Sequence, residues 1–434
     1  MELNVIDMIP GAGKTKYMAE YLSQAGKRFI YLTPYNEEVE HVRRSILEGK
    51  WTDLQKLAMD TGQYTEEDFG ISGPSVPIDK FSKSSSALRL IRENKDVVCT
   101  HELFKLLCRT KSFWKLLEGK NYSLVIDEEL QLSEHYTFRG CTYDDVLFYL
   151  MRPIDGEAPV VSCAEDGKLS WDSRNKTAGK GTFRWLKKDM RTDNLYANNG
   201  IVEWQVPLDK FVVFDDVYLM TYRFENSLFC KRLVHDNVEL NHYYFDGNKL
   251  VEGKWRISRE QADSIRRRVV VGGKGCYPND VGKKGHYSYS RAWYDEATDE
   301  DIQKVVKKMQ SYLKQSAAKR RLDKNKVIWT TFKDFREKFE AADVGENTFR
   351  PKRGEVETFV PLNMKASNKY LDRNVVFYVV DRYMGPRDDE WALSELLQFL
   401  FRTSLRLEDS EEKVYVWVPS ERMRGLLVKW LEEL

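Results

Sequence analysis

The sequence predicts an α/β protein with two lobes, each built around a parallel sheet. In the first third of the chain, short apolar runs alternate with amphipathic stretches, which is the pattern of strand–helix units. A second series of the same kind occupies the C-terminal part, beyond an irregular middle. We therefore expect a first lobe at 1–230, with insertions at about 50–93 and 140–210, a basic middle region at 231–325, and a second lobe at 326–434.

Each expected element follows from its pattern of apolar residues. Strands are short apolar runs bounded by polar or turn residues, and they are expected at 3–8, 28–32, 96–99, 123–126, 211–214, 217–221, 327–329, 358–362, 375–380 and 414–418. Helices repeat their apolar residues every three or four positions, and they are expected at 14–24, 37–47, 102–117, 332–339, 390–403 and 421–434. Gly, Pro and Ser at 62–86 and a polar composition at 152–200 indicate loops or insertions.

Composition and charge exclude several classes of protein. The 434 residues carry 69 Lys and Arg against 68 Asp and Glu, so the chain is neither a polycation nor an acidic tail protein. The 42% of hydrophobic residues can form a buried core. The six cysteines are dispersed with no C-x-x-C pair, which argues against a disulfide framework or a zinc site. Because no apolar run approaches the roughly 18 residues of a membrane span and the first residues lack the charge of a signal peptide, we expect a cytoplasmic protein without a membrane partner.

The strongest motif is a glycine-rich loop between an expected strand and an expected helix. Its residues are Pro10, Gly11, Ala12, Gly13, Lys14 and Thr15. Glycines let backbone N–H groups converge on phosphate oxygens, and the helix N-terminus adds partial positive charge. Lys14 is then expected to reach the β- and γ-phosphates of ATP, and Thr15 to bind Mg²⁺. The full phosphate-loop pattern has glycine where this chain has Met8, and the alternative is a glycine-rich turn that happens to precede Lys-Thr.

The second motif is an apolar strand that ends in three acids, Asp127, Glu128 and Glu129. A carboxylate at a strand end beside a phosphate loop can hold Mg²⁺, and Asp127 has that position. Glu128 is expected to act as the general base that activates water. Alone, such a strand end is more often a solvated turn. Together with the phosphate loop upstream, it predicts hydrolysis of a nucleoside triphosphate.

With these two motifs, the chain resembles superfamily 2 helicases, the DEAD/DEAH-like class, and most of all the DEAD-like helicases of phages and mobile elements. The resemblance covers both lobes and implies two RecA-like P-loop lobes with ATP and Mg²⁺ between them. The acids at 127–129 stand where the class has its D-E-x-x tetrad. The segment from Ala392 to residue 434 is most similar to the mobile-element family, which implies a phage or plasmid context and the bacterial host cytoplasm.

Further motifs of the class that contact nucleic acid have counterparts in this chain. Residues 32–34 resemble the first of them, residues 99–101 a second, and residues 363–373 the one that contacts both nucleotide and strand. Residues 219–222 stand in the place of the coupling motif, although the usual S/T-A-T is absent. The resemblance implies nucleic-acid contacts at Thr33, Pro34, Thr100, His101, Asn363 and Asn368.

The second lobe carries a counterpart of the arginine-finger helix, after residues 328–332, which resemble its strand-edge motif. Gln398, Arg402 and Arg406 resemble this helix, with the second arginine at +8 where the class has +7. Positions three and four apart share a helix face, so we expect the three side chains to project together. The resemblance implies that the arginines stabilise charge on the transferred phosphoryl group. A basic amphipathic helix face is the alternative.

The middle of the chain carries a local excess of positive charge. Residues 251–330 contain 19 Lys and Arg against 10 Asp and Glu, with Tyr287, Tyr289, Trp293 and Tyr294 interleaved. Phosphate neutralisation combined with base stacking is how proteins hold single strands, so this region is expected to contact nucleic acid. The candidate residues are Arg266, Arg267, Arg268 and Lys274. A solvated basic face with aromatic residues in the core is the alternative.

The leading hypothesis from the sequence is an ATP hydrolase of the helicase type that moves along or unwinds DNA, in phage or mobile-element replication or recombination. Its partners would be single-stranded or forked DNA, with RNA as an alternative, and replication accessory proteins. The rival hypothesis is a clamp or remodelling factor that nucleic acid stimulates but that separates no strands. A P-loop small-molecule kinase fits the phosphate loop alone and leaves the second lobe without a role.

Overall fold

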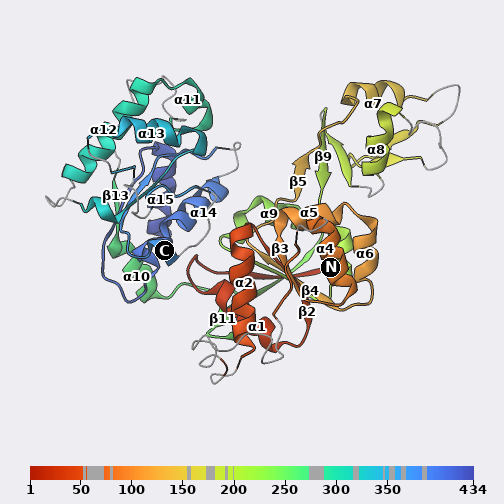
Figure 1. Ribbon diagram of the computed structural model, residues 1–434, viewed down its shortest axis with the longest axis horizontal. Helices are drawn as coiled ribbons and strands as arrows, with labels where there is room; N and C mark the ends of the chain where they lie inside the picture. Colours follow the sequence, from red (N-terminus) through yellow and green to blue (C-terminus); the bar gives the residue numbers. More distant parts are fainter. Residues whose placement is uncertain are drawn as a thin grey trace. The chain divides into compact units, whose positions relative to one another are not determined.

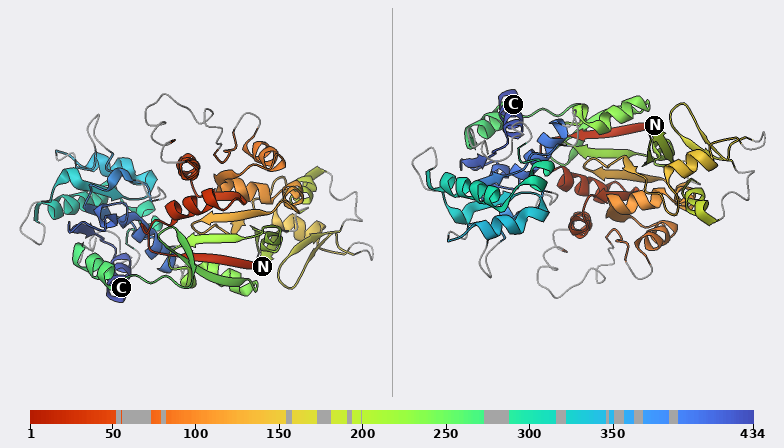
Figure 2. Two further views of the ribbon diagram at one scale, coloured as in Figure 1. Left: turned by 90° about the horizontal axis from the view of Figure 1, so that it is seen from below. Right: turned by 90° about the horizontal axis from the view of Figure 1, so that it is seen from above.

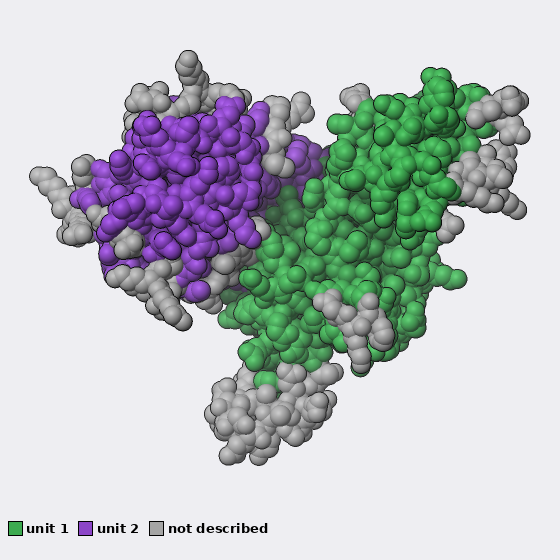
Figure 3. Space-filling view, turned by 45° about the horizontal axis from the view of Figure 1, so that its top comes forward, with its two compact units in different colours: residues 1–7, 14–221, 232–254 green, residues 8–13, 222–231, 255–434 purple. Residues whose placement is uncertain are grey.

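Two largely parallel sheets organise the chain, one in each of its two units (Figure 1; Figure 3). Unit 1 comprises Met1–Asp7, Lys14–Thr221 and Arg232–Lys254, and unit 2 comprises Met8–Gly13, Tyr222–Lys231 and Trp255–Leu434. This computed structural model describes residues 1–51, 55, 73–78, 82–153, 158–172, 181–190, 194–198, 200–272, 288–315, 322–345, 348–350, 357–362, 368–383 and 389–434.

Among the described residues, the sheet of unit 1 has seven strands in the order β12-β11-β1-β10-β4-β2-β3. These are β1 (Glu2–Asp7), β2 (Arg28–Thr33), β3 (Val97–Thr100), β4 (Tyr122–Asp127), β10 (Val217–Thr221), β11 (Glu239–Asp246) and β12 (Lys249–Glu252). Every neighbouring pair is parallel except β11 and β12, which form an antiparallel hairpin. Strands β4 and β10 bury every residue, as expected of continuous apolar runs covered on both faces.

Helices flank this sheet (Figure 1). They are α1 (Lys14–Gln24), α2 (Asn36–Gly49), α4 (Lys83–Arg92), α5 (His101–Cys108), α6 (Lys111–Leu117) and α9 (Leu228–His235), of which α9 is shared between the two units. Because parallel strands end at the same edge of a sheet, the segments that follow β1, β2, β3, β4 and β10 lie at one edge. The register shows this directly, since Asp7 pairs with Thr221 and Met220 pairs with Asp127.

A module of its own sheets and helices is inserted between β4 and β10, and we call residues 133–205 the inserted module (Figure 1; Figure 2). Its elements are β5 (Ser133–His135), α7 (Tyr143–Tyr149), β6 (Val161–Cys163), β7 (Leu169–Trp171), α8 (Arg184–Asp189), β8 (Leu195–Asn198) and β9 (Ile201–Gln205). Strands β5, β9 and β8 form an antiparallel sheet, and β6 pairs with β7. The two ends of the module lie together, because Ser133 pairs with Gln205 and the Val206 N–H donates to the Leu132 carbonyl over 2.8 Å.

The sheet of unit 2 is parallel, with the order β13-β16-β15-β14 among the described residues. Its strands are β13 (Val269–Gly272), β14 (Val327–Thr330), β15 (Val375–Tyr378) and β16 (Val414–Trp417). Successive strand residues point to opposite faces, and two separate cores follow from this alternation. Ile328 and Val376 belong to one core and Trp329 and Phe377 to the other.

Each face of that sheet has its own set of helices. The face of Ile328 packs against α10 (Arg259–Arg268), α14 (Asp389–Leu400) and α15 (Glu421–Glu433). The face of Trp329 packs against α11 (Arg291–Glu296), α12 (Asp299–Gln315) and α13 (Arg336–Ala342). Within the described ranges, none of the helices in either unit has both the length and the apolar character that crossing a bilayer needs.

Several expected elements differ from the structure. The strand expected at 211–214 is absent, because residues 211–213 belong to a 3₁₀ helix, Leu208–Val213, and Phe214 caps its end. The expected helix at 102–117 breaks into α5 and α6 after Cys108. Residues 358–362 pair with β14 only through an isolated bridge between Trp329 and Phe359.

The middle of the chain is divided between the two units instead of forming a region at 231–325. Strands β11 and β12 extend the sheet of unit 1, whereas α10 and β13 belong to unit 2. Tyr289, Trp293 and Tyr294, which were expected to stack on bases, are buried in the core of unit 2. For these three residues the alternative, aromatic residues in the core, is therefore correct, and Tyr287 lies outside the described residues.

Candidate functional site

The glycine-rich loop joins β1 to α1, and its conformation explains its glycines. Gly11 and Gly13 have φ angles of +90° and +79°, in the left-handed region that side chains disfavour. The Ala12 N–H donates to the Ile9 carbonyl over 3.2 Å, which closes a tight turn. Helix α1 begins directly at Lys14, and the first N–H groups of a helix have no acceptor within it. Such a turn at a helix N-terminus can bind a phosphate group.

Two chain segments far apart in sequence meet beside this loop, in unit 1. The Thr15 hydroxyl donates to Asp127 Oδ2 over 3.1 Å, and Asp127 is the buried last residue of β4. The Tyr31 hydroxyl, from the adjacent strand β2, donates to the same oxygen over 3.1 Å. Burial and then the Asp127 carboxylate raise the pKa of Tyr31 well above its ordinary value, so the hydroxyl keeps its proton and remains a donor. Tyr31 and Thr15 thus orient the Asp127 carboxylate.

The two acids after Asp127 lie at a sharp bend of the backbone. Glu128 has a φ of +65°, which costs a residue other than glycine roughly 1–3 kcal/mol. Its N–H donates to the Met220 carbonyl of β10 over 2.8 Å, which fixes the bend. The Thr221 hydroxyl at the end of β10 donates to Glu129 Oε1 over 3.5 Å. The segment expected to couple the motifs therefore contacts both acids, through a backbone carbonyl and a hydroxyl.

The expected nucleic-acid contacts of the first lobe lie together at the carboxyl edge of the sheet, where Thr33 pairs with Thr100. The side chains of both threonines and of His101 are buried. The Thr33 hydroxyl donates to the Tyr35 carbonyl over 2.9 Å, and Thr100 caps α5 by accepting the Leu103 N–H. These hydroxyls are thus engaged in local structure, and contact with a strand at Thr33, Pro34, Thr100 and His101 stays a prediction.

The expected arginine-finger helix is shorter than predicted. Helix α14 ends at Leu400, so Gln398, Arg402 and Arg406 do not share one helix face. Arg402 is 1% exposed, and its guanidinium donates to the carbonyls of Pro361 and Leu362 over 3.5 and 3.4 Å. Arg406 follows in a separate 3₁₀ turn, Ser404–Arg406, and is half-buried. Burial lowers the pKa of Arg406, but its ordinary value is so high that it stays a cation.

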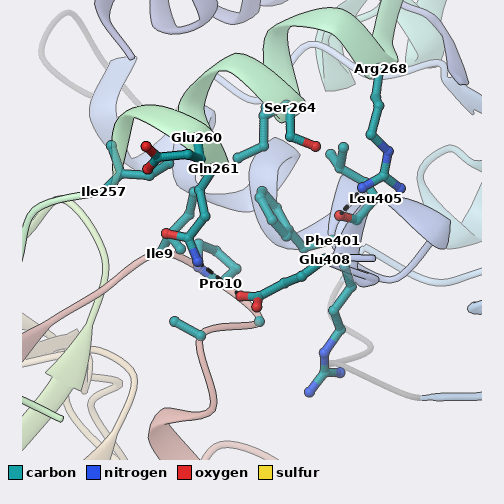
Figure 4. Close-up of a pocket in the computed structure, with 14 residues that line it drawn as sticks. Ile9, Pro10, Ile257, Glu260, Gln261, Ser264, Arg268, Phe401, Leu405 and Glu408 are labelled. Atoms are coloured by element: carbon teal, nitrogen blue, oxygen red, sulfur yellow. Dashed lines mark hydrogen bonds between the residues drawn. The ribbon is translucent and has the colours of Figure 1, made fainter. Parts of the chain in front are cut away.

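Arg406 lies beside the phosphate loop within unit 2. A Cβ added at Gly11 would lie 3.0 Å from Arg406 Cγ, so the arginine stem packs on the loop. The two residues line a pocket of about 170 Å³. Its other walls come from α10 and from Phe401–Glu408, where Gln261 Nε2 donates to Glu408 Oε1 over 3.0 Å (Figure 4). Of the two expected fingers, Arg406 is the one that the structure places next to the glycine-rich loop.

The basic residues of α10 have different environments, and one of them was predicted wrongly. Arg268 is 2% exposed, and its guanidinium donates to four backbone carbonyls, those of Ser404, Leu405, Leu407 and Glu412. It therefore holds the turn that carries Arg406 and is not available to nucleic acid. The guanidinium of Arg266 is bonded to the Leu431 carbonyl and to Asp263.

Arg266 and Arg267 are both exposed, and the guanidinium of Arg267, the more exposed of the two, lies 3.5 Å from the Glu411 carboxylate. Lys274 and Asn363 lie outside the described residues, and Asn368 begins a 3₁₀ turn, Asn368–Tyr370, without a described side chain. Contact with nucleic acid at Arg266, Arg267, Lys274, Asn363 and Asn368 stays a prediction.

Replacing Arg268 is expected to destabilise unit 2. Arg268→Ala leaves four buried carbonyls without their donor, and hydrogen bonds to a charged group are worth about 1.5–3 kcal/mol each, so we expect a loss of about 3 kcal/mol or more in the free energy of unfolding. Arg267→Ala is the matched control on the same helix, because an exposed ion pair contributes less than about 1 kcal/mol. Urea unfolding of the two variants measures the difference, and equal midpoints would contradict the structural role.

Sequence reasoning missed Tyr31 and the role of Arg268. Tyr31 lies two residues before the expected contact Thr33, inside an apolar strand, where nothing but its hydroxyl distinguishes it from a core residue. The signal that could have found it is the parallel pairing of β2 with β4, which brings Tyr31 beside the strand of Asp127. For Arg268 the local sequence gives no signal, since Arg266–Arg268 reads as one basic run.

Comparisons with known proteins bear on both units. A family described as the YonV C-terminal Rossmann-like domain matches residues 264–431, which include all four strands of the unit 2 sheet. The SPbeta prophage-derived uncharacterized protein YonV of Bacillus subtilis (strain 168) is 26% identical over 458 residues, covering 99% of this chain and 98% of the relative.

Solved structures of helicases also align with the whole chain. One described as an XPD helicase is 11% identical with a TM-score of 0.43, covering 100% of this chain and 94% of that one. Dbp5 of S. cerevisiae, bound to RNA and ADP BeF3, is 11% identical with a TM-score of 0.40, and the alignment covers 100% of this chain and 82% of that one. The DUF1998 helicase MrfA, bound to DNA and AMPPNP, is 10% identical with a TM-score of 0.37, and the alignment covers 100% of this chain and 48% of that one.

The curated relative is prophage-derived, in line with the expected similarity to a phage-associated family, and the resemblance to superfamily 2 helicases stays a prediction. The expected α/β class with two lobes built on parallel sheets is confirmed, because each unit has a largely parallel sheet and the C-terminal part matches a Rossmann-like family. The RecA-like character of the two lobes stays a prediction. This chain is thus similar over nearly its full length to a prophage protein of Bacillus subtilis, and in its C-terminal part to the YonV-type Rossmann-like domain.

Proposed function

We propose that this chain is an ATP hydrolase of the helicase type, in which hydrolysis drives movement along DNA or its unwinding. The observation that carries the proposal is the hydrogen bond between the Thr15 hydroxyl and Asp127 Oδ2. This bond joins Thr15, which directly follows Lys14 of the glycine-rich loop, to Asp127, the first of the three acids at 127–129. A hydroxyl and a carboxylate held together beside a phosphate-binding turn are the protein ligands that Mg²⁺ takes in such enzymes.

The donor set suits Mg²⁺ better than a metal held by protein alone. Mg²⁺ commonly keeps one or two protein ligands and completes its shell with water and substrate phosphates. In the part of the chain that the structure describes, no three His, Cys, Asp or Glu side chains converge as a metal site, so a protein-only cage is not built there. Thr15 and Asp127 would hold the ion, which would neutralise charge on the phosphates.

The remaining side chains have separable roles in the proposal. Gly11 and Gly13 let the backbone N–H groups face the phosphates, and Lys14 binds the β- and γ-phosphates. Glu128 accepts a proton from the attacking water, and its left-handed backbone sets where the carboxylate leaves the strand. Arg406, beside Gly11, stabilises negative charge that develops on the γ-phosphate.

A role in phage or mobile-element replication or recombination is also part of the proposal. Its support is the prophage origin of the 26%-identical relative, which this chain matches over 98% of that protein's length. Single-stranded or forked DNA and replication accessory proteins are the partners that we propose. The second candidate function, a nucleic-acid-stimulated clamp or remodelling factor, shares the same nucleotide chemistry and differs only in separating no strands.

The proposal predicts that nucleic acid accelerates ATP hydrolysis. Phosphate release is measured with no nucleic acid, single-stranded DNA, duplex DNA, a fork and single-stranded RNA, each at equal nucleotide concentration. We expect the rate to rise with single-stranded or forked DNA and to fall again as salt is added, because phosphate contacts release counterions. A rate that none of these nucleic acids changes would contradict the proposal. A strand-displacement assay on the fork then distinguishes unwinding from a clamp.

A further inference from the structure

The inserted module exposes aromatic rings where a helix would ordinarily bury them. Of the seven residues of α7, all described, only Val146 is buried, whereas Phe148 and Tyr149 are each 54% exposed. Leu147 beside them is exposed as well, so three consecutive apolar residues face solvent at the end of one short helix. This departs from the amphipathic pattern, in which apolar residues turn inward. Exposed apolar clusters of this kind commonly mark binding surfaces.

These rings are held in place by one another and by the neighbouring helix. The rings of Phe148 and Tyr149 meet edge to face with centroids 4.8 Å apart. Helix α8 is the neighbour of α7 in the module (Figure 1). The ring centroids of Tyr149 and of Phe183, the residue before α8, are 6.4 Å apart, so the aromatic surface continues from α7 toward α8. The guanidinium of Arg152 stacks over Phe148 with 4.9 Å to its centroid. A ring fixed on two sides loses little rotational freedom when a ligand stacks on it.

Basic side chains lie on α8, which begins directly after Phe183. Arg184 and Lys188 of α8 are exposed, and Arg184 and Arg139 each lie 4.7 Å from the centre of Trp185. Asp189, the acid of α8, pairs with Arg139 over 2.8 Å. We call Phe148, Tyr149, Arg152, Phe183, Arg184 and Lys188 the stacking face. It combines the exposed rings at the end of α7 with exposed cations, two of them on α8 and one, Arg152, just after α7.

The stacking face belongs to a module that is firmly attached to the helix beside the expected strand contacts. Glu134 of β5 forms ion pairs with Lys105, which is buried, and with Arg109, and both basic residues lie on or directly after α5. The Arg109 guanidinium also stacks on Trp204 of β9 at 4.2 Å. Helix α5 begins at His101, next to Thr100. The base of the module is therefore joined to the helix whose first residues were expected to contact nucleic acid.

We propose that the stacking face binds single-stranded nucleic acid, with bases stacked on Phe148 and Tyr149 and phosphates near Arg152, Arg184 and Lys188. Every base has a π-face, and rings flanked by cations are the chemistry that holds single strands without regard to sequence. An apolar protein partner would desolvate these cations without neutralising them, and an acidic one would leave the exposed rings unused. The inference rests on the proposed function and names a part of its nucleic-acid site.

The test compares Phe148→Ala/Tyr149→Ala with Ile201→Ala, a matched variant of another half-exposed apolar residue on β9 of the same module. Fluorescence anisotropy, without ATP, measures the affinity of labelled oligo(dT), of an oligo(U) of the same length and of an abasic strand that keeps the phosphates but has no bases. Loss of two stacked bases should weaken oligo(dT) binding about tenfold or more. The affinity of Phe148→Ala/Tyr149→Ala for the abasic strand should equal that of the unsubstituted protein. Ile201→Ala should bind all three strands with unchanged affinity.

The charged part of the stacking face is tested by Arg184→Glu/Lys188→Glu. This variant should bind all three strands less tightly, the abasic one included. The slope of the logarithm of affinity against the logarithm of salt concentration should fall by an amount that corresponds to about two phosphate contacts. Comparison of oligo(dT) with oligo(U) shows whether the face prefers DNA or RNA. Both double variants change exposed side chains, so we expect both to fold. Their circular dichroism spectra should match that of the unsubstituted protein.

The outcomes separate this inference from the proposed function. If Phe148→Ala/Tyr149→Ala binds oligo(dT) as tightly as Ile201→Ala does, or loses equal affinity for the abasic strand, the stacking role is overturned even when nucleic acid still stimulates hydrolysis. If neither double variant changes the affinity for any of the strands, and an acidic protein binds the stacking face instead, the inference is equally overturned. If the affinities change as expected while the protein hydrolyses no ATP, the stacking face stands and the proposed function fails.

Discussion

Glu128→Gln is expected to abolish ATP hydrolysis while ATP binding and the fold are retained. Glutamine has nearly the same shape as glutamate but cannot accept the proton of the attacking water, and a general base contributes about 10²–10⁴-fold to a rate. The backbone should be unaffected, because both residues face the same strain at a φ of +65° and keep the N–H that bonds to Met220. Phosphate release, binding of a fluorescent ATP analogue and a thermal melt measure the three properties.

Two further variants show which group acts as the base. Lys14→Ala should lose both nucleotide binding and hydrolysis, since the ammonium group contacts phosphates before and during the reaction. Glu129→Gln should keep most of the hydrolysis, because Glu129 is already bonded to Thr221. Normal turnover in a folded Glu128→Gln protein, or loss of turnover in Glu129→Gln alone, would show that the base has been assigned wrongly.

Arg406→Ala is expected to slow hydrolysis about a thousandfold, in line with the effect of arginine fingers on phosphoryl transfer. Its stem carbons pack on Gly11, and in the proposed reaction its guanidinium stabilises charge on the γ-phosphate. Arg406→Lys should restore little, because a single ammonium cannot reproduce the planar, two-pronged donor. The measurement is kcat at saturating ATP.

Arg402→Ala provides the comparison for that experiment. Arg402 is buried and donates to the carbonyls of Pro361 and Leu362, so its removal should lower the thermal midpoint of unit 2 more than Arg406→Ala does. Whether hydrolysis or stability suffers more distinguishes a residue that acts on phosphate from one that supports the fold. If a fully stable Arg402→Ala protein lost kcat about a thousandfold while Arg406→Ala stayed active, Arg402 would be the residue that acts on phosphate and Arg406 the one that supports the fold.

The sequence predicted the strands and the helix around the glycine-rich loop and the acids at 127–129 well, because their patterns are local. Glycines before a helix, an apolar strand ending in acids, and the strands that carry them are all visible as short patterns. The bond between Thr15 and Asp127 then follows from the parallel order of the strands. Tyr31 was not predictable in this way, because its role depends on which strand becomes the neighbour of β4.

The predictions failed where a basic or amphipathic pattern has two physical meanings. Arg266, Arg267 and Arg268 look alike in sequence, yet Arg268 is buried against four carbonyls and the other two are exposed. Only the packing of α10 on the turn at 404–407 decides between them. The helix expected at 390–403 ends early because the chain turns after Leu400, so a spacing argument along one helix could not place Arg406.

The attachment of the inserted module has an evolutionary consequence. Its first and last residues, Ser133 and Gln205, are paired on neighbouring strands, and the flanking residues Leu132 and Val206 share a backbone hydrogen bond. A short turn could therefore replace the whole segment without moving β4 or β10. Such a segment can be gained, lost or exchanged as a cassette while the acids at 127–129 keep their place at the sheet edge.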